Sequence, residues 1–119
     1  MLTDIGKELR KLRIETDERL MDMAKRLDKS ASFISAVEVG KKSPPSDFEE
    51  AVIKIYQLAG DAAEALRRAA DRSRKAFTIE PSSALGRDTA ALLARRINNL
   101  SDSQLKEIRE ILFKGSKPA

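Results

Sequence analysis

The sequence predicts an all-α protein, and three observations lead to that class. Ala, Leu, Glu, Lys and Arg dominate the 119 residues, and these residue types are strong helix formers. Aromatic residues make up only 4% of the chain, and β-branched residues are few, which disfavours strands. Apolar residues recur at intervals of three and four along the chain, which is the spacing of one helical face.

The first helix is predicted to begin after Thr3, whose side chain suits a helix cap, and to end near residues 15–17. Arg13 lies near the edge of the apolar stripe, so we expect it to be partly buried. The stripe itself consists of Ile5, Leu9 and Leu12.

Two short helices are predicted next, over residues 19–27 and 30–39, with a three-residue turn between them. Ser30 is a good cap for the second helix, because its hydroxyl can accept from backbone N–H groups one turn ahead. Gly40 follows where a left-handed terminal residue is wanted. The residues expected to face the core are Leu20, Met23, Ala24, Leu27, Ile34 and Val37.

Later helices are marked by capping patterns, in which a short polar residue is followed three positions later by Glu or Gln. Residues 77–83 break the helical pattern, and residues 78–81 are expected to be extended because the residue before Pro81 avoids helix. Residues 115–119 are expected to form a loose tail. The capping pairs are Ser46 with Glu49, Asp61 with Glu64, and Ser101 with Gln104, and the predicted helices cover residues 46–60, 62–76, 87–98 and 101–112.

The composition excludes several classes of protein. Without His or Cys the chain has no Ser–His or Cys–His pair, no disulfide and none of the usual zinc ligand sets. Adjacent carboxylates such as Glu49 and Glu50 point in different directions on a helix, and no Gly-rich phosphate loop is present. We therefore expect no enzyme activity, no metal and no cofactor. No run approaches 18 apolar residues and no secretory signal is visible, so we expect a cytoplasmic protein without a membrane partner.

The charge permits an anionic partner. The net charge is +4 and the isoelectric point about 9.5. Residues 1–42 hold ten basic and eight acidic residues, and residues 81–119 hold seven basic and four acidic ones.

The block from Leu20 to Gly40 has the layout of a helix-turn-helix. In this block and around it the sequence resembles the lambda-repressor-like, or XRE and Cro-type, DNA-binding family. The resemblance covers residues 5–58 and implies a helix-turn-helix DNA-binding domain of four to five helices at residues 1–60, followed by a helical C-terminal extension at 61–119. It is carried by Leu9-x-x-Leu12-Arg13, Met23-Ala24-x-x-Leu27, Ile34-x-x-Val37-Glu38 and Gly40-Lys41.

This resemblance implies that the helix after Ser30 enters the major groove of double-stranded DNA. Its outward residues are small, so we expect alanines to touch thymine methyls and serines to bond base edges or phosphates. Lys41 and Lys42 are the best candidates for phosphate contacts, with Arg19, Arg26 and Lys29 as weaker ones. The predicted DNA-binding residues are Lys29, Ser30, Ala31, Ser32, Phe33, Ser35, Ala36, Lys41 and Lys42.

Three further positions are interpreted through the resemblance. Arg13 and Glu38 match residues that form a structural ion pair in relatives, between the first helix and the end of the third. Phe33 either packs on the first helix or projects toward DNA. Leu20 stands where the family often has a polar residue that holds a phosphate.

The C-terminal region has an apolar stripe whose role stays open between local core and subunit interface. A single helix-turn-helix buries little DNA surface, which favours a homodimer on a palindromic operator, as expected for a transcriptional repressor. The alternative is an antitoxin that neutralises a protein toxin and regulates its own operon, because the run from Leu20 to Lys41 resembles HigA-type antitoxins and related prophage regulators. The stripe comprises Leu92, Leu93, Leu100, Leu105, Ile108, Ile111 and Leu112.

Overall fold

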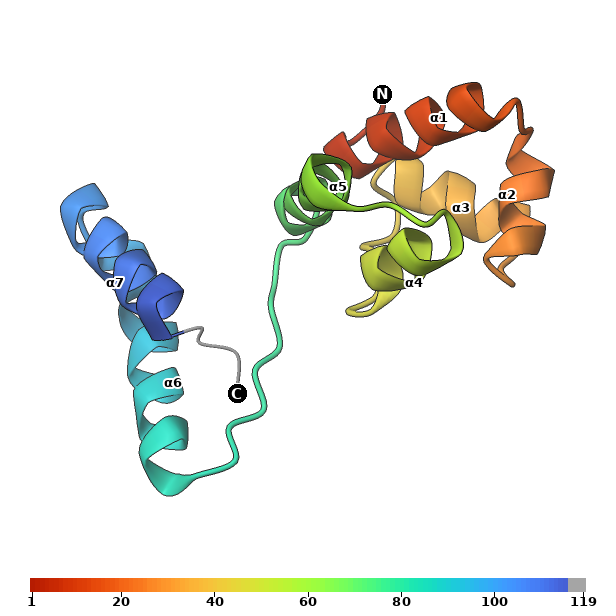
Figure 1. Ribbon diagram of the computed structural model, residues 1–119. Helices are drawn as coiled ribbons and strands as arrows, with labels where there is room; N and C mark the ends of the chain where they lie inside the picture. The colour runs from red at the N-terminus through yellow and green to blue at the C-terminus, as the bar shows by residue number, and fades with distance from the viewer. Residues whose placement is uncertain (116–119) are drawn as a thin grey trace. The chain divides into compact units, whose positions relative to one another are not determined.

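The computed structural model describes residues 1–115 and divides the chain into two compact units, Met1–Phe77 and Thr78–Ala119. Figure 1 shows that the described residues form helices joined by turns and loops, without a strand. The first unit contains α1 (Asp4–Thr16), α2 (Leu20–Arg26), α3 (Ala31–Glu38), α4 (Phe48–Ile55) and α5 (Gly60–Arg72). The second contains α6 (Ala84–Arg96), the 3₁₀ turn η1 (Ile97–Asn99) and α7 (Asp102–Gly115).

The ends of α1 and α3 form as the sequence predicts. The hydroxyl of Thr3 accepts from the Gly6 amide at 3.1 Å, and the hydroxyl of Ser30 accepts from the Phe33 amide at 3.0 Å. Gly40 adopts a left-handed conformation with φ of 82°, which glycine reaches without a steric penalty. These local signals therefore position the boundaries of α3.

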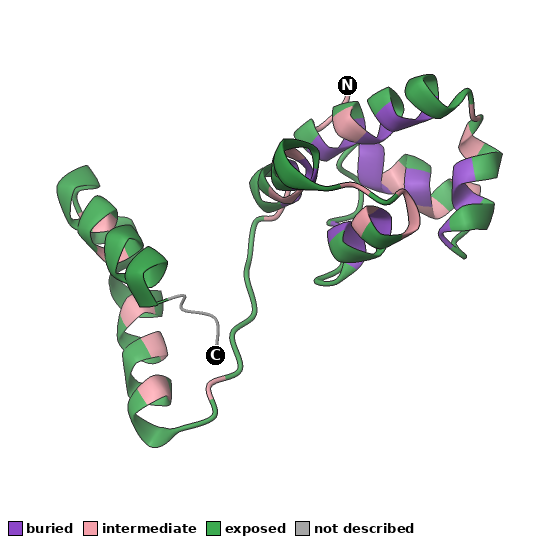
Figure 2. Cartoon of the chain, in the orientation of Figure 1, coloured by how far each residue is buried: buried purple, intermediate pink, exposed green. Residues whose placement is uncertain are grey.

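The core of the first unit is built from one apolar face of each of its five helices. Figure 2 shows the buried positions lining the inner faces of these helices. The predicted core residues of α1, α2 and α3 are confirmed, except that Leu20 is only partly buried at the edge of the core. The largest side chains with almost no exposed surface are Ile5, Leu9, Met23, Ile34, Val37, Val52 and Leu66.

Helix α5 belongs to this first unit, so the unit extends to Phe77 rather than to the expected boundary at residue 60. Leu66, Ala69 and Ala70 lie in the same core as α1 and α4. The two alanines are small enough to allow a close approach of the helices. The Ser73 hydroxyl also accepts from the Ile5 amide at 3.2 Å, which joins the end of α5 to the start of α1.

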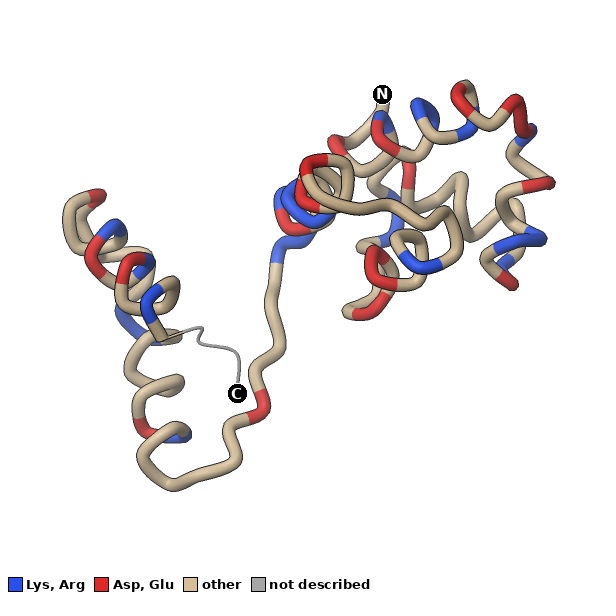
Figure 3. The backbone as a smooth tube through the Cα atoms, in the orientation of Figure 1, with Lys and Arg blue, Asp and Glu red and all other residues tan. Residues whose placement is uncertain are grey.

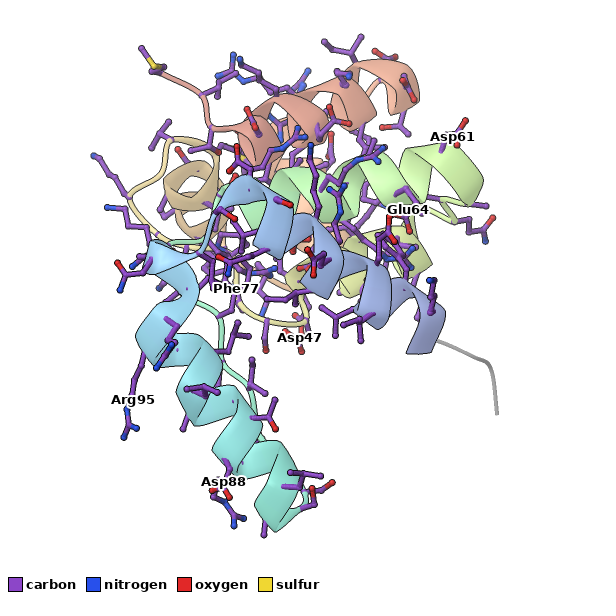
Figure 4. The ribbon with its side chains drawn as sticks, turned by 90° about the vertical axis from the view of Figure 1, so that its left-hand side faces the viewer. Asp47, Asp61, Glu64, Phe77, Asp88 and Arg95 are labelled. Atoms are coloured by element: carbon purple, nitrogen blue, oxygen red, sulfur yellow. The ribbon has the colours of Figure 1, made fainter. Side chains whose placement is uncertain are left out.

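Two of the three predicted capping boxes are wrong. Helix α4 is capped at Asp47 and not at Ser46, without a side-chain hydrogen bond, and the Glu49 carboxylate is bound by Arg74. Helix α5 begins at Gly60, which was expected to end α4, and Asp61 projects from its exposed first turn in Figure 4. In α4 a distant partner replaced the expected local contact, whereas in α5 the Glu64 carboxylate is bound by Arg67, three positions along the same helix.

The third predicted capping box, Ser101 with Gln104, is confirmed in the second unit. The Ser101 amide donates to the Gln104 side chain at 2.9 Å, and the Gln104 amide donates to the Ser101 hydroxyl at 3.1 Å. Helix α6 begins three residues before the expected start, because the Ser83 hydroxyl accepts from the Gly86 amide at 2.9 Å.

The second unit has no core of its own among the residues that the structure describes. No residue of α6, η1 or α7 is buried, and Leu93, Leu100, Leu105 and Ile108 are only partly covered. Figure 2 shows these helices as exposed with scattered intermediate positions. Within residues 1–115, no helix has the length and apolar content needed to cross a bilayer.

Candidate nucleic-acid interface

Helix α3 has one face in the core and one face open to solvent. Ile34 and Val37 are 0% and 1% exposed and anchor the helix. Ser32 and Ser35 are exposed, and Ala31 and Ala36 are partly exposed beside them. This separation follows from the helical period, which places Ile34 and Val37 opposite the two serines. A helix held from behind in this way can present its outer face to a ligand.

The outer face of α3 borders a shallow surface groove. The groove runs beside the start of α2 and the residues that follow α3, and its lining is small, apolar and hydroxylic apart from one lysine. A groove with this chemistry can offer methyl groups and hydroxyls to DNA base edges. Its lining residues are Leu20, Ala31, Ser32, Ser35, Ala36, Val39 and Lys41.

Positive charge lies beside α3 rather than on it. In Figure 3 the helix carries no charged residue before Glu38 at its end. The amides of Lys41 and Lys42 donate to the Ala36 carbonyl at 2.9 and 3.2 Å, which folds both residues back over the end of α3. Both lysine residues are exposed, as expected for phosphate-binding candidates.

The two adjacent lysines lie against different surroundings. Lys41 borders the groove with the exposed serines of α3. The Lys42 ammonium instead lies 5.3 Å from the centre of the Phe33 ring, and the Lys29 ammonium lies 5.5 Å from the same ring. The structure therefore brings together the predicted residues in two groups, one around the serines and one around Phe33.

Phe33 packs on α4, a position that the sequence analysis did not consider when it weighed the first helix against DNA. Its ring centre lies 6.0 Å from that of Phe48, with the ring planes tilted by 59°. The residue is partly buried against the core of the first unit. The sequence could not indicate this contact, because Phe48 belongs to a separate helix across a proline-containing loop.

An arginine that the sequence analysis missed holds the loop after α3. Arg74 follows α5, and its Nε donates to the Pro44 carbonyl at 3.0 Å, while its other nitrogens reach the Pro45 carbonyl and the Glu49 carboxylate. The hydrogen bond with Glu49 raises the pKa of Arg74. This side chain fixes the segment that comes directly after the two lysines.

The predicted ion pair between Arg13 and Glu38 is present and buried. The two guanidinium nitrogens lie 2.5 and 3.2 Å from the two carboxylate oxygens, so the pair is bidentate. The side chains are 10% and 4% exposed. The pair joins α1 to the end of α3 and so fixes the orientation of the candidate interface.

Two further residues at this junction were also missed. The Thr3 amide and hydroxyl donate to the Glu38 carbonyl at 2.9 and 3.1 Å. Gly6 lies so close that a Cβ on it would be 2.9 Å from the Glu38 Cα. A glycine one turn after a helix cap was a visible signal, but only the close approach of α3 explains it.

Arg26, a weaker phosphate candidate, is occupied by structural contacts. It donates to Glu18 at 2.8 Å and to the Ile55 carbonyl at 3.1 Å, and its guanidinium carbon lies 3.9 Å from the centre of the Tyr56 ring. Burial, followed by the charge of Glu18, raises the pKa of Tyr56 to about 12. These contacts tie α2 to the end of α4 and engage both terminal nitrogens of the guanidinium group.

No metal centre is apparent in residues 1–115. Nowhere in this part of the chain do three Asp or Glu side chains gather closely enough to hold an ion. The groups that α3 and its surroundings offer are hydroxyls, methyl groups and nearby lysine ammonium groups.

A comparison with known families agrees with this geometry. A family model described as a helix-turn-helix domain matches residues 4–66, which is more than half of the chain. The matched segment runs from the start of α1 into α5, the helices that share the core. No curated protein and no solved structure matches the chain.

Proposed function

The chain belongs to the helix-turn-helix domain family, of the lambda-repressor-like type, and from this we propose that it is a sequence-specific regulator of transcription that binds double-stranded DNA. We further propose that it acts as a repressor, as a homodimer on a palindromic operator. Helix α3 is the recognition helix in this proposal. Its N-terminal half enters the major groove, where each base pair presents a distinct pattern of donors and acceptors.

One observation carries the proposal. Ser32 and Ser35 are exposed on a helix whose opposite face is anchored by Ile34 and Val37. The serine hydroxyls can donate to or accept from base edges, and the neighbouring alanine methyls can contact thymine. Because no long side chain on this face makes a bidentate base contact, sequence-dependent DNA shape contributes to the specificity.

Phosphate contacts are assigned to the lysines around α3. Lys41 lies beside the serine face, and Lys29 and Lys42 lie beside Phe33. Their charges neutralise phosphates on both sides of the recognition helix. Such contacts set the register of the protein on the duplex without reading its sequence.

The second unit supports the dimer. Leu85, Leu92 and Ile111 are between 53% and 78% exposed, and no described residue of α6 or α7 is buried. Two short helices that expose apolar side chains gain stability when a further surface covers them. A second copy of this unit would provide that surface and would bring two recognition helices to two half-sites.

The experiment is selection of bound duplexes from a random pool, followed by footprinting on the selected sequence. We expect one enriched sequence with two-fold symmetry and half-sites about one helical turn apart. Ser32→Leu should change or abolish the selected sequence, and Ala62→Leu, which adds a leucine to the exposed surface of α5, serves as the control. A pool that shows no enrichment would contradict the proposal.

The dimer is tested by sedimentation of the full chain with and without the selected duplex. We expect a dimer in both cases, and two protein chains on each palindromic duplex. A full chain that sediments as a monomer under both conditions would contradict the dimer while leaving DNA binding intact.

The alternative proposal is an antitoxin that binds a protein toxin and regulates its own operon. The exposed apolar side chains of α6 favour it as well, since a toxin could cover them in place of a second copy. Co-expression with the product of the neighbouring gene distinguishes the two. A stable complex that suppresses a toxic activity supports the antitoxin, and a neighbour that neither binds nor is toxic excludes that pair.

A further inference from the structure

We propose that Phe33 is a positioning residue that holds the Lys29 and Lys42 ammonium groups in place for the DNA backbone. This inference rests on the proposed DNA binding and assigns Phe33 a role that differs from reading a base. The observation behind it is that two lysines from opposite ends of α3 lie over the same aromatic ring.

The position of the Phe33 ring is restrained by its neighbours. Phe33 lies in the first turn of α3, where its amide donates to the Ser30 hydroxyl at 3.0 Å. Its side chain packs against Phe48, whose own side chain is 3% exposed. The helix cap thereby fixes the backbone of Phe33, and the contact with Phe48 restrains its ring.

The two lysines reach the Phe33 ring from separate segments of the chain. Lys29 lies in the turn before α3, and Lys42 lies in the loop after it. Their ammonium nitrogens are 5.5 and 5.3 Å from the ring centre, within the range of a cation–π interaction. The electron-rich face of the ring attracts both cations and offsets their mutual repulsion.

This arrangement suits a phosphate contact for a physical reason. A free lysine side chain loses much rotamer freedom when it is fixed on a ligand. A side chain that is already restrained by a ring loses less on binding, so its contact is stronger. The restraint also holds two positive charges beside the first turn of the recognition helix.

The role differs from a direct apolar contact of Phe33 with a base. If Phe33 touched a thymine methyl, its replacement would change the preferred sequence. A residue that acts through Lys29 and Lys42 changes the affinity for every duplex by a similar factor, because phosphates are common to all sequences.

The test compares Phe33→Leu with Phe33→Tyr in the full chain. Leucine keeps an apolar side chain against Phe48 but has no ring, and tyrosine keeps the ring. Without DNA, we expect ring-current shifts of the Lys29 and Lys42 side-chain protons in the wild type and in Phe33→Tyr, and their loss in Phe33→Leu. Circular dichroism establishes that each variant is folded.

Binding is then measured with a short mixed-sequence duplex over a series of salt concentrations. Phe33→Leu should bind about fivefold more weakly, which corresponds to about 1 kcal/mol and is the size of one or two exposed cation–π contacts. Phe33→Tyr should bind like the wild type. In a Lys29→Ala/Lys42→Ala background, Phe33→Leu should have no further effect, since the groups that it positions are absent.

The outcomes separate this inference from the function on which it rests. A wild-type chain that binds no duplex overturns the proposed function and this role together. A wild type that binds, with Phe33→Leu equal to it, overturns the positioning role alone. The role is also overturned if Phe33→Leu is equally weakened in the double-lysine background, or if it changes the selected sequence.

Discussion

The backbone of Gly6 in α1 lies directly against the backbone of Glu38 at the end of α3, because a Cβ on Gly6 would overlap the Glu38 carbonyl oxygen. That same carbonyl accepts hydrogen bonds from Thr3, and the Glu38 side chain is bound by Arg13. The end of the proposed recognition helix is therefore held by the first helix through backbone contact, hydrogen bonds and a buried charge pair.

Replacing Gly6 should destabilise the first unit. Gly6→Ala forces the Glu38 backbone to move, and we expect the free energy of unfolding to fall by about 2 kcal/mol, as for other overpacked positions. Thermal and denaturant unfolding measure the effect. Gly115→Ala is the control, because nothing lies within 4 Å of a Cβ at that position, and equal losses in the two variants would contradict the close approach.

Removing one partner of the buried ion pair should have a large effect. Glu38→Ala leaves the Arg13 guanidinium buried without its carboxylate, and we expect a loss of about 3–5 kcal/mol in denaturant unfolding. Lys11→Ala removes the exposed pair with Glu8 at 3.0 Å and should cost about 0.5 kcal/mol. If Glu38→Ala and Lys11→Ala unfold at the same denaturant concentration, the Arg13–Glu38 pair does not have the stabilising role expected of a buried ion pair.

The lysines after α3 should contribute to DNA binding without regard to sequence. Lys41→Ala and Lys42→Ala should each weaken binding to all duplexes and reduce the salt dependence by roughly 0.9 in the logarithmic slope for each lost phosphate contact. Lys54→Ala, an exposed lysine in α4, is the matched control. Unchanged slopes in the first two variants would show that these lysines do not contact phosphates.

Stability should fall in alkaline solution because of Tyr56. The pKa of Tyr56 is raised to about 12, first by burial and then by the charge of Glu18, whereas the pKa of an unfolded tyrosine is about 10. The folded state therefore keeps the phenol proton more tightly. The stabilisation that comes from the raised pKa of Tyr56 is complete below about pH 10, and it is lost as the pH rises toward about 12.

The measurement uses the fact that Tyr56 is the only tyrosine and that tryptophan is absent. Ultraviolet absorbance then follows tyrosinate formation directly, and the comparison with Tyr56→Phe separates this group from titrating lysines. Tyrosinate formation with a midpoint near pH 10 in the folded protein would contradict the raised pKa of Tyr56. An identical decline of stability in Tyr56→Phe would contradict it as well.

Local patterns determined the helices of the first unit and the faces that they bury. The Thr3 and Ser30 caps, the left-handed Gly40 and the apolar spacing of α1 to α3 each involve residues only a few positions apart. Short-range hydrogen bonds and the helical period are sufficient to specify such features. The exposed serines of α3 follow from the same period.

One error in the prediction arose where a distant residue competed with a local one. Glu49 was expected to complete a helix cap, but Arg74, twenty-five positions away, binds it with two hydrogen bonds. In this pair both partners are charged and two hydrogen bonds form, whereas a bond to a backbone amide has a charge on the carboxylate alone. A sequence pattern shows which groups are able to interact, and it contains no information on which of two partners is nearer.

The sequence by itself determined the positions of the first three helices, their buried faces and the small, uncharged outer face of α3. Only the tertiary structure decided that α5 completes the core, that Phe33 rests on Phe48, and that Lys29 and Lys42 share its ring. The physical reason is that helical periodicity specifies an apolar face but not its partner. That choice depends on groups far apart in the chain, such as the Ile5 amide and the Ser73 hydroxyl, that meet only when the whole core is packed.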